Sequence, residues 1–221
     1  MGTVQRDGAS TWAERAHVLT SSAEARALYD DWAPTYDGDI AGPDGEGYPL
    51  PGVVADLVAR LDESTADVLD AACGTRLVGE ALARHGFTSV DGLDVSPRML
   101  SLARARHVYH DLGPADLSKR VPGAGDKFGV VTCVNAFEPG HLPRSALVEF
   151  ARVVHRGGHI VLTVGIERRG EIEKHVQQLA DRGVVRLVEA SEALLHPSTG
   201  ECHVVVVLEI VGSSRGSGPR W

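Results

Sequence analysis

Hydrophobic positions along the chain alternate between two patterns. Short, nearly continuous apolar runs are typical of strands covered on both faces of a parallel sheet, and they occur at residues 68–69, 90–95, 128–134 and 159–165. Between these runs, apolar side chains recur at intervals of three and four residues, which predicts helices at residues 52–61, 97–106, 145–154 and 171–181, and from residue 77 onward. This alternation of strands and helices predicts an α/β fold around a mostly parallel sheet.

The two ends of the chain depart from this alternation. Residues 12–27 have helical periodicity ahead of the first strand, with a break at Ser21-Ser22. Residues 184–195 and 201–211 predict a closing antiparallel hairpin. The chain is long enough for one α/β domain with its own core. We therefore expect three segments, an N-terminal helical cap, the α/β domain and a disordered tail, at residues 1–28, 29–212 and 213–221.

Two of the predicted strands end in an acid at the same edge of the sheet. Asp70 follows the first strand and leads into Ala72 and Gly74, whose small side chains let a ligand approach the backbone. Asp94 closes the second strand, and one βαβ unit with a right-handed crossover places the two strand ends side by side. A strand, a tight turn and a helix N-terminus together favour a nucleotide site, in which Asp94 accepts from both ribose hydroxyls.

The segment Asp70-Ala71-Ala72-Cys73-Gly74-Thr75-Arg76 resembles D-x-G-x-G-x-G, the first motif of class I S-adenosylmethionine-dependent methyltransferases. Ala72 replaces the first glycine, the second is kept, and Arg76 stands at the third. Ahead of this motif, residues 29–37 carry Tyr-Asp-x-Trp-Ala-x-x-Tyr-Asp, which is similar to the Williams-Beuren syndrome region methyltransferase-like family. The resemblance covers roughly residues 29–165.

This resemblance implies a Rossmann-like methyltransferase fold, with a seven-stranded sheet whose last strand is antiparallel and with helices on both faces. It also implies S-adenosylmethionine as the cofactor and S-adenosylhomocysteine as the product. By the family pattern, Asp111 accepts from the adenine amino group while the backbone N–H of Leu112 meets a ring nitrogen. The cofactor-contacting residues expected in this chain are Tyr36, Asp70, Ala72, Gly74, Arg76, Asp94, Val95, Asp111, Leu112 and Asn135.

The aromatic residues of the N-terminal segment have two interpretations. In enzymes of this family such aromatics fold over the cofactor, which makes Tyr36 and Trp32 candidates for contacts to its methionine part. The alternative is that both side chains only pack a helix onto the sheet, and we expect this for Trp32.

Reactive groups are expected in the loop after the fourth strand, at residues 135–143. His141 is a candidate general base because an unperturbed imidazole titrates near neutrality. Glu138 is a candidate for orienting a substrate amine or hydroxyl. The alternative is that His141 is a solvated loop histidine.

Arg76 separates two functional hypotheses. A position adapted to glycine requires a backbone angle that arginine disfavours, at a cost of about 1–3 kcal/mol. The side chain points inward into cofactor space, lies outward in solvent, or pairs with the methionine carboxylate, and we expect the first. If methyl transfer is lost, the chain is a binding module or an enzyme that uses the cavity for cyclisation or elimination. Otherwise it methylates a small-molecule acceptor at oxygen, nitrogen or carbon.

Charge narrows the range of partners. The formal net charge of -8 gives no electrostatic footprint for nucleic acid or an anionic membrane. Residues 135–138 also differ from the Asn/Asp-Pro-Pro-Tyr/Phe segment of a flipped-base pocket. We expect a small-molecule acceptor, no nucleic-acid or membrane partner, and a monomer or homodimer. With neither a transmembrane nor a signal-peptide pattern, the sequence predicts a cytoplasmic protein.

No metal site is expected. The three cysteines lack the C-x-x-C spacing of zinc sites. His107 and His110 bridge a helix end and a strand, and His155 and His159 flank a Gly-Gly turn, so neither pair has a fixed ligand face.

Overall fold

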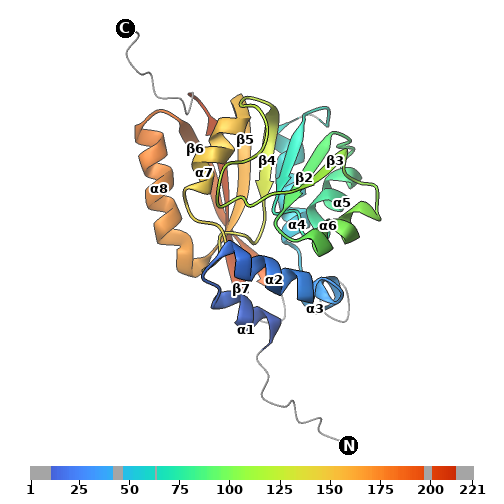
Figure 1. Ribbon diagram of the computed structural model, residues 1–221. Helices are drawn as coiled ribbons and strands as arrows, with labels where there is room; N and C mark the ends of the chain where they lie inside the picture. The colour runs from blue at the N-terminus through green and yellow to red at the C-terminus, as the bar shows by residue number, and fades with distance from the viewer. Residues whose placement is uncertain (1–10, 42–46, 63, 197–200, 213–221) are drawn as a thin grey trace, which may run out of the picture.

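The computed structural model describes residues 11–41, 47–62, 64–196 and 201–212. In these ranges seven strands form one sheet in the order β3-β2-β1-β4-β5-β7-β6 (Figure 1). β7 runs antiparallel to both of its neighbours, and the other pairs are parallel, which confirms the expected fold. The strands are β1 (Val68–Ala71), β2 (Val90–Asp94), β3 (Asp111–Pro114), β4 (Phe128–Cys133), β5 (Val154–Gly165), β6 (Val185–His196) and β7 (Glu201–Ile210).

Helices cover both faces of this sheet and cross one of its edges. The helices are α1 (Trp12–His17), α2 (Ser22–Trp32), α3 (Tyr36–Ala41), α4 (Leu50–Leu61), α5 (Leu77–Arg84), α6 (Pro97–Arg104), α7 (Ala146–Val153) and α8 (Arg169–Asp181), with a 3-10 turn at Ile166–Arg168. Each predicted helix is present within a few residues of its expected bounds. Among the described residues, no helix has both the length and the apolar character that crossing a bilayer requires.

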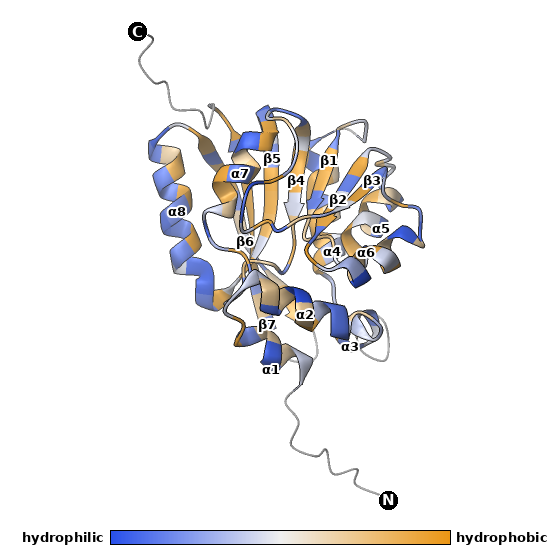
Figure 2. Cartoon of the chain, in the orientation of Figure 1, coloured by the Kyte–Doolittle hydropathy of each residue, from blue (hydrophilic) through white to orange (hydrophobic). Residues whose placement is uncertain are grey.

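Neighbouring strand residues point to opposite faces of the sheet and so enter two separate cores. Val68 and Val130 pack in one core with side chains of α4 and α5. Leu69 and Val131 pack in the other with side chains of α7 and α8. Figure 2 shows the resulting layers, apolar strands between helices whose outward surfaces are largely polar. Both faces of β1 and β4 are therefore buried, as their continuous apolar runs predict.

Serine side chains set the starts of two helices. Ser21 accepts a hydrogen bond from the backbone N–H of Glu24 and begins α2, which confirms the predicted break after α1. Ser96 accepts from the backbone N–H of Met99 at 3.1 Å and begins α6. The boundary expected between cap and domain, after residue 28, falls inside α2. The cap and the domain thus share a helix.

The N-terminal helices α1, α2 and α3 lie across the carboxyl ends of the parallel strands (Figure 1). This placement puts them over the sheet edge at which ligands collect in open α/β folds. The turn expected at residues 197–200 and the tail expected from residue 213 lie outside the described residues.

The third strand differs from its expected position. The family resemblance implies that Asp111 lies at the carboxyl end of this strand, but β3 begins at Asp111 and ends at Pro114. In the parallel register, Asp111 pairs with Asp91 at the start of β2, whereas Pro114 pairs with Asp94 at the end. Asp111 and Leu112 therefore lie toward the amino ends of the strands, and their predicted contacts to adenine are wrong.

Candidate functional site

A cavity opens at the carboxyl ends of β1, β2, β3 and β4, and we call it the strand-end cavity. The turns after these four strands supply most of its walls, and α2 and α3 close it from outside. It is lined by Ser22, Ala25, Tyr29, Tyr36, Ala72, Gly74, Asp94, Val95, Met99, Ala115, Asp116, Leu117, Ser118, Val134, Asn135, Ala136, His141 and Leu142. Six of the ten expected cofactor residues are in this lining, and Asp70, Arg76, Asp111 and Leu112 are not.

The turn after β1 approaches the cavity through left-handed backbone angles. Ala72, Gly74 and Arg76 have φ angles of 61°, 53° and 118°. A Cβ atom added at Gly74 meets nothing within 4 Å, so the backbone angle, and not crowding, favours glycine there. Arg76 carries the backbone strain that its glycine-like position predicts, at about 1–3 kcal/mol.

The Arg76 side chain turns away from the strand-end cavity. Its Nη1 atom donates to Asp37 Oδ2 at 2.8 Å, and its Nε atom donates to Glu80 Oε1 at 2.8 Å. Thr75 donates its hydroxyl proton to the other oxygen of Asp37. This differs from the expectation that the guanidinium occupies cofactor space, because two carboxylates hold it outside.

Asp94 closes β2 and faces the strand-end cavity. Its two carboxylate oxygens accept from the backbone N–H groups of Gly74 and Ser96, each at 2.8 Å. Burial raises the pKa of this carboxyl, and the backbone hydrogen bonds oppose that rise. Asp94 thus joins the β1 turn to the end of β2, where Val95 also lines the cavity. Each carboxylate oxygen can accept further hydrogen bonds from a ligand.

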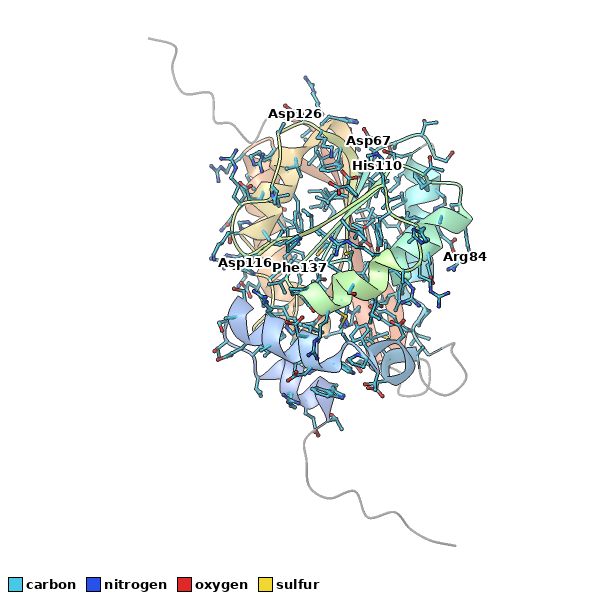
Figure 3. All side chains as sticks on the ribbon, turned by 45° about the vertical axis from the view of Figure 1, so that its right-hand side comes forward. Asp67, Arg84, His110, Asp116, Asp126 and Phe137 are labelled. Carbon is cyan, nitrogen blue, oxygen red and sulfur yellow. The ribbon has the colours of Figure 1, made fainter. Side chains whose placement is uncertain are left out.

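Asp116 is the acid that follows the carboxyl end of β3, and sequence reasoning missed it. Although burial opposes the shift, hydrogen bonds from the hydroxyls of Ser118 and Ser22 lower the pKa of Asp116 to about 2. Figure 3 shows Asp116 near the N-terminal helices, whereas His110, which precedes Asp111, lies toward the other end of the sheet. The available signal was Pro114, which ends the strand two residues before this acid.

Asp70 lies beneath the β1 turn and does not line the cavity. It accepts from the Tyr109 hydroxyl at 2.7 Å and from the Thr132 hydroxyl at 3.1 Å. Burial raises the pKa of Asp70 to about 7, against the effect of these two hydrogen bonds. In the described structure its partners are side chains of the chain itself, which fix the end of β1 relative to β4.

His141 is half-buried and bonded at both ring nitrogens. Its Nδ1 atom lies 2.9 Å from the carbonyl oxygen of Pro139, and its Nε2 atom lies 2.7 Å from the hydroxyl of Tyr29. A carbonyl only accepts, so Nδ1 carries the proton and Nε2 accepts from Tyr29. Burial lowers the pKa of His141 and keeps the ring neutral. The alternative of a solvated loop histidine is therefore wrong.

A second cavity lies on the other side of Tyr29 and His141, between α1, α2, α3 and β7, and we call it the α1–β7 cavity. Glu138 lines this cavity and is absent from the strand-end cavity. Its Oε1 atom accepts from the backbone N–H of Gly165 at 2.9 Å, and burial raises its pKa. The expected catalytic pair is thus split, since His141 lines both cavities and Glu138 only one.

Tyr36 and Trp32 take different positions in the N-terminal layer. Tyr36 lines both cavities and is hydrogen-bonded to the side chain of Asn135. Trp32 donates from Nε1 to Asp39 at 2.8 Å and stacks on Tyr29, with 5.9 Å between ring centroids. Trp32 is buried in packing, as expected, and it also lines the α1–β7 cavity. Tyr36 also packs against Trp32, and its role as a lid residue stays a prediction.

Comparison with known proteins identifies the central part of the chain. The family profile described as "Methyltransferase domain" matches residues 69–162. Methyltransferase-like protein 27 of Homo sapiens is 34% identical over 152 residues, which are 67% of this chain and 60% of that protein. The chain thus spans less than two thirds of the length of this relative.

Two solved structures are similar in fold. The crystal structure of the 4+2 cyclase SpnF has a TM-score of 0.69 at 16% identity and covers 88% of this chain and 98% of that one. The crystal structure of magnesium protoporphyrin IX methyltransferase (ChlM) from Synechocystis PCC 6803, with bound SAM, has a TM-score of 0.66 at 17% identity. The match covers 94% of this chain and 100% of that one. At these identities the likeness is one of fold alone.

Proposed function

We propose that this chain, which belongs to the class I S-adenosylmethionine-dependent methyltransferases, transfers a methyl group from S-adenosylmethionine to a small-molecule acceptor. The observation that carries the proposal is the pair of acids at neighbouring strand ends. Asp94 ends β2 and Asp116 follows β3, and both line the strand-end cavity. Their spacing along one sheet edge suits a ligand with a sugar beside a base.

The residues present fit this cofactor. Asp94 is assigned to the ribose hydroxyls, as a carboxylate that accepts from both. Asp116 is assigned to the adenine amino group, with the backbone N–H of Leu117 beside it, in place of Asp111 and Leu112. Gly74 leaves open space for the methionine part, since nothing lies within 4 Å of a Cβ added there. Tyr36 and Asn135 complete the proposed contacts on the side of the N-terminal helices.

When bound, the sulfonium supplies a methyl group that reacts with any nucleophile placed in line with it. The contribution of the chain is positioning, which can account for much of the rate of such a transfer. Tyr29 and His141 lie where the strand-end cavity meets the α1–β7 cavity. The neutral Nε2 atom of His141 takes up a proton through Tyr29 if the acceptor must lose one.

The rival hypothesis, a chain without methyl transfer, depended on Arg76. The Arg76 guanidinium is bonded to Asp37 and Glu80, and Arg76 is absent from the lining of the strand-end cavity. Because the side chain does not fill this cavity, Arg76 does not favour the loss of methyl transfer. The likeness to a cyclase is a likeness of fold and adds no argument about the reaction. A cytoplasmic location and a monomer or homodimer stay predictions.

Native mass spectrometry after incubation with S-adenosylmethionine tests the proposed function. We expect the purified chain to retain one molecule of S-adenosylmethionine or S-adenosylhomocysteine. A chain that retains neither at millimolar cofactor would contradict the proposal. Adenosine monophosphate serves as the control ligand, because it has the same sugar and base without the methionine part.

A further inference from the structure

Two cavities of the described structure meet at four side chains that they have in common. Tyr29, Tyr36, Asn135 and His141 line both the strand-end cavity and the α1–β7 cavity. If the first holds the cofactor, a molecule in the second lies beside the cofactor where the two cavities meet. We infer that the α1–β7 cavity holds the methyl acceptor and selects an acceptor that carries an amino group. This inference rests on the proposed methyl transfer and adds the chemical class of the acceptor.

The charge of the cavity favours a cation. Three carboxylates line it, those of Asp39, Glu138 and Glu201, and the lining residues that the structure describes include neither lysine nor arginine. Two histidines, His17 and His203, also line the cavity, and His203 Nε2 lies 3.6 Å from Glu138 Oε1. The nearby Arg168 donates from Nη1 to the carbonyl oxygen of Glu138 at 3.0 Å and from Nε to Glu171 at 2.9 Å. Its charge is thus paired outside the cavity. An anionic acceptor would meet like charges in a partly desolvated space.

Two of these carboxylates are held rigidly. Asp39 accepts through Oδ2 from Trp32 Nε1 at 2.8 Å and from the Thr35 hydroxyl at 2.7 Å. Glu138 accepts through Oε1 from the backbone N–H of Gly165. These bonds fix the position of each carboxylate while engaging one of its oxygens. A fixed carboxylate loses little side-chain entropy when it accepts from an ammonium group.

The walls of the cavity match a small molecule with an apolar body. Trp32, Tyr29 and Tyr36 present aromatic surface, and such rings attract a cation electrostatically. The volume of the cavity is about 140 Å³. This is close to the roughly 150 Å³ of a protein cavity that admits benzene. The occupant that fits is one ring or a short chain bearing an amino group.

An amine at neutral pH must lose a proton before it can attack a methyl group. The ammonium gives a proton to the Tyr29 oxygen as the Tyr29 hydroxyl proton passes to His141 Nε2. The freed nitrogen lone pair then forms the new N–C bond while the C–S bond breaks and its electron pair stays on sulfur. The products are a protonated methylamine, S-adenosylhomocysteine and an imidazolium, which releases its proton to water.

Calorimetry with three matched probes tests this inference. Benzylamine, benzyl alcohol and benzoate share one ring and differ in charge, and each is titrated into the chain with and without S-adenosylhomocysteine. We expect benzylamine to bind at least tenfold more tightly than the other two. Glu138→Gln keeps an acceptor for Gly165 but removes the charge, and it should reduce this preference at least fivefold. Asp39→Asn is the second variant, in case the first does not fold.

The control variant is Glu173→Gln, which removes an exposed carboxylate on α8 and should leave the preference unchanged. The inference is overturned if benzyl alcohol or benzoate binds as well as benzylamine, including the case in which no probe binds. It is also overturned if Glu138→Gln and Asp39→Asn both keep the full preference. The two proposals fail in different measurements. If the chain does not bind the cofactor, the methyl-transfer proposal fails, but the titrations of the three probes without cofactor still test the charge preference of the cavity.

Discussion

Asp37 in α3 accepts a hydrogen bond from Arg76 at the start of α5, with 2.8 Å between Oδ2 and Nη1. The same carboxylate accepts from the hydroxyl of Thr75, so α3 is bound to the turn after β1 at two points. Arg76 keeps a backbone angle that favours glycine, and its side chain gains two carboxylate partners there. Arg76 thus links the N-terminal helices to the turn after β1.

Replacing Arg76 tests this link. Arg76→Gly relieves about 1–3 kcal/mol of backbone strain but leaves Asp37 without its arginine. We expect the affinity for S-adenosylhomocysteine to change less than threefold, and amide hydrogen exchange in α3 to become faster. Asp37→Asn is the matched control, since it weakens the same link and keeps the strain. A tenfold gain in affinity with Arg76→Gly would mean that the side chain crowds the cofactor.

The corrected adenine contact gives a paired prediction. Asp116→Ala removes an acceptor for the adenine amino group and should weaken S-adenosylhomocysteine binding at least tenfold, because a hydrogen bond to a charged group contributes about 1.5–3 kcal/mol. Asp111→Ala should leave affinity unchanged, because Asp111 lies at the amino end of β3. Calorimetric titration of both variants measures the difference. The reverse order of effects would restore the contact predicted from the sequence.

Asp70 makes stability depend on pH. Its folded pKa of about 7 is above the roughly 3.9 of an unfolded chain, so the folded state holds a proton that the unfolded state releases. Stability therefore falls as pH rises from about 4 to 7 and stays lower above 7, with a full difference of about 4 kcal/mol. Urea unfolding at pH 5 and pH 8 should show this decrease in the parent and much less of it in Asp70→Asn. Equal decreases in the two proteins would remove Asp70 as the cause.

His141 makes stability depend on pH in the opposite direction. Its folded pKa lies below the roughly 6.5 of an unfolded histidine, so as pH falls below 6.5 the unfolded state takes up a proton first. The contribution of His141 to stability is complete above about pH 6.5 and is lost as pH falls through the folded pKa. His141→Gln keeps an acceptor for Tyr29 and should be less sensitive to acid between pH 7.5 and 5. NMR titration of the ring protons gives the pKa directly, and a value above 6.5 would contradict the neutral, buried ring.

Periodicity in the sequence accounts for most of the fold. Continuous apolar runs predicted β1, β2 and β4 because those strands are covered on both faces. β3 has one leucine among four residues, and its two end residues are exposed. The local sequence therefore gave no apolar run from which to place its ends. The register with β2 decides them, and that is a tertiary relationship.

The candidate site could also be predicted from the sequence only in part. Asp94 ends an apolar strand, and Gly74 and Asn135 lie in the turns just after two others, so their position at the strand ends could be predicted from the chain alone. The direction of the Arg76 side chain could not, because it depends on Asp37 in a different element. The separation of Glu138 from the strand-end cavity depends on how α1, α2 and α3 pack over the loop after β4, which has no local signal.

The most direct measurement is calorimetric titration of S-adenosylhomocysteine into the parent chain and into Asp94→Ala. Asp94 joins two strand ends and faces the strand-end cavity, so its carboxylate is the proposed ribose contact. The proposed site predicts binding to the parent and at least tenfold weaker binding to the variant, provided that circular dichroism shows the variant to be folded. Equal affinity in the two proteins, or no binding to the parent, would contradict a cofactor site at this edge of the sheet.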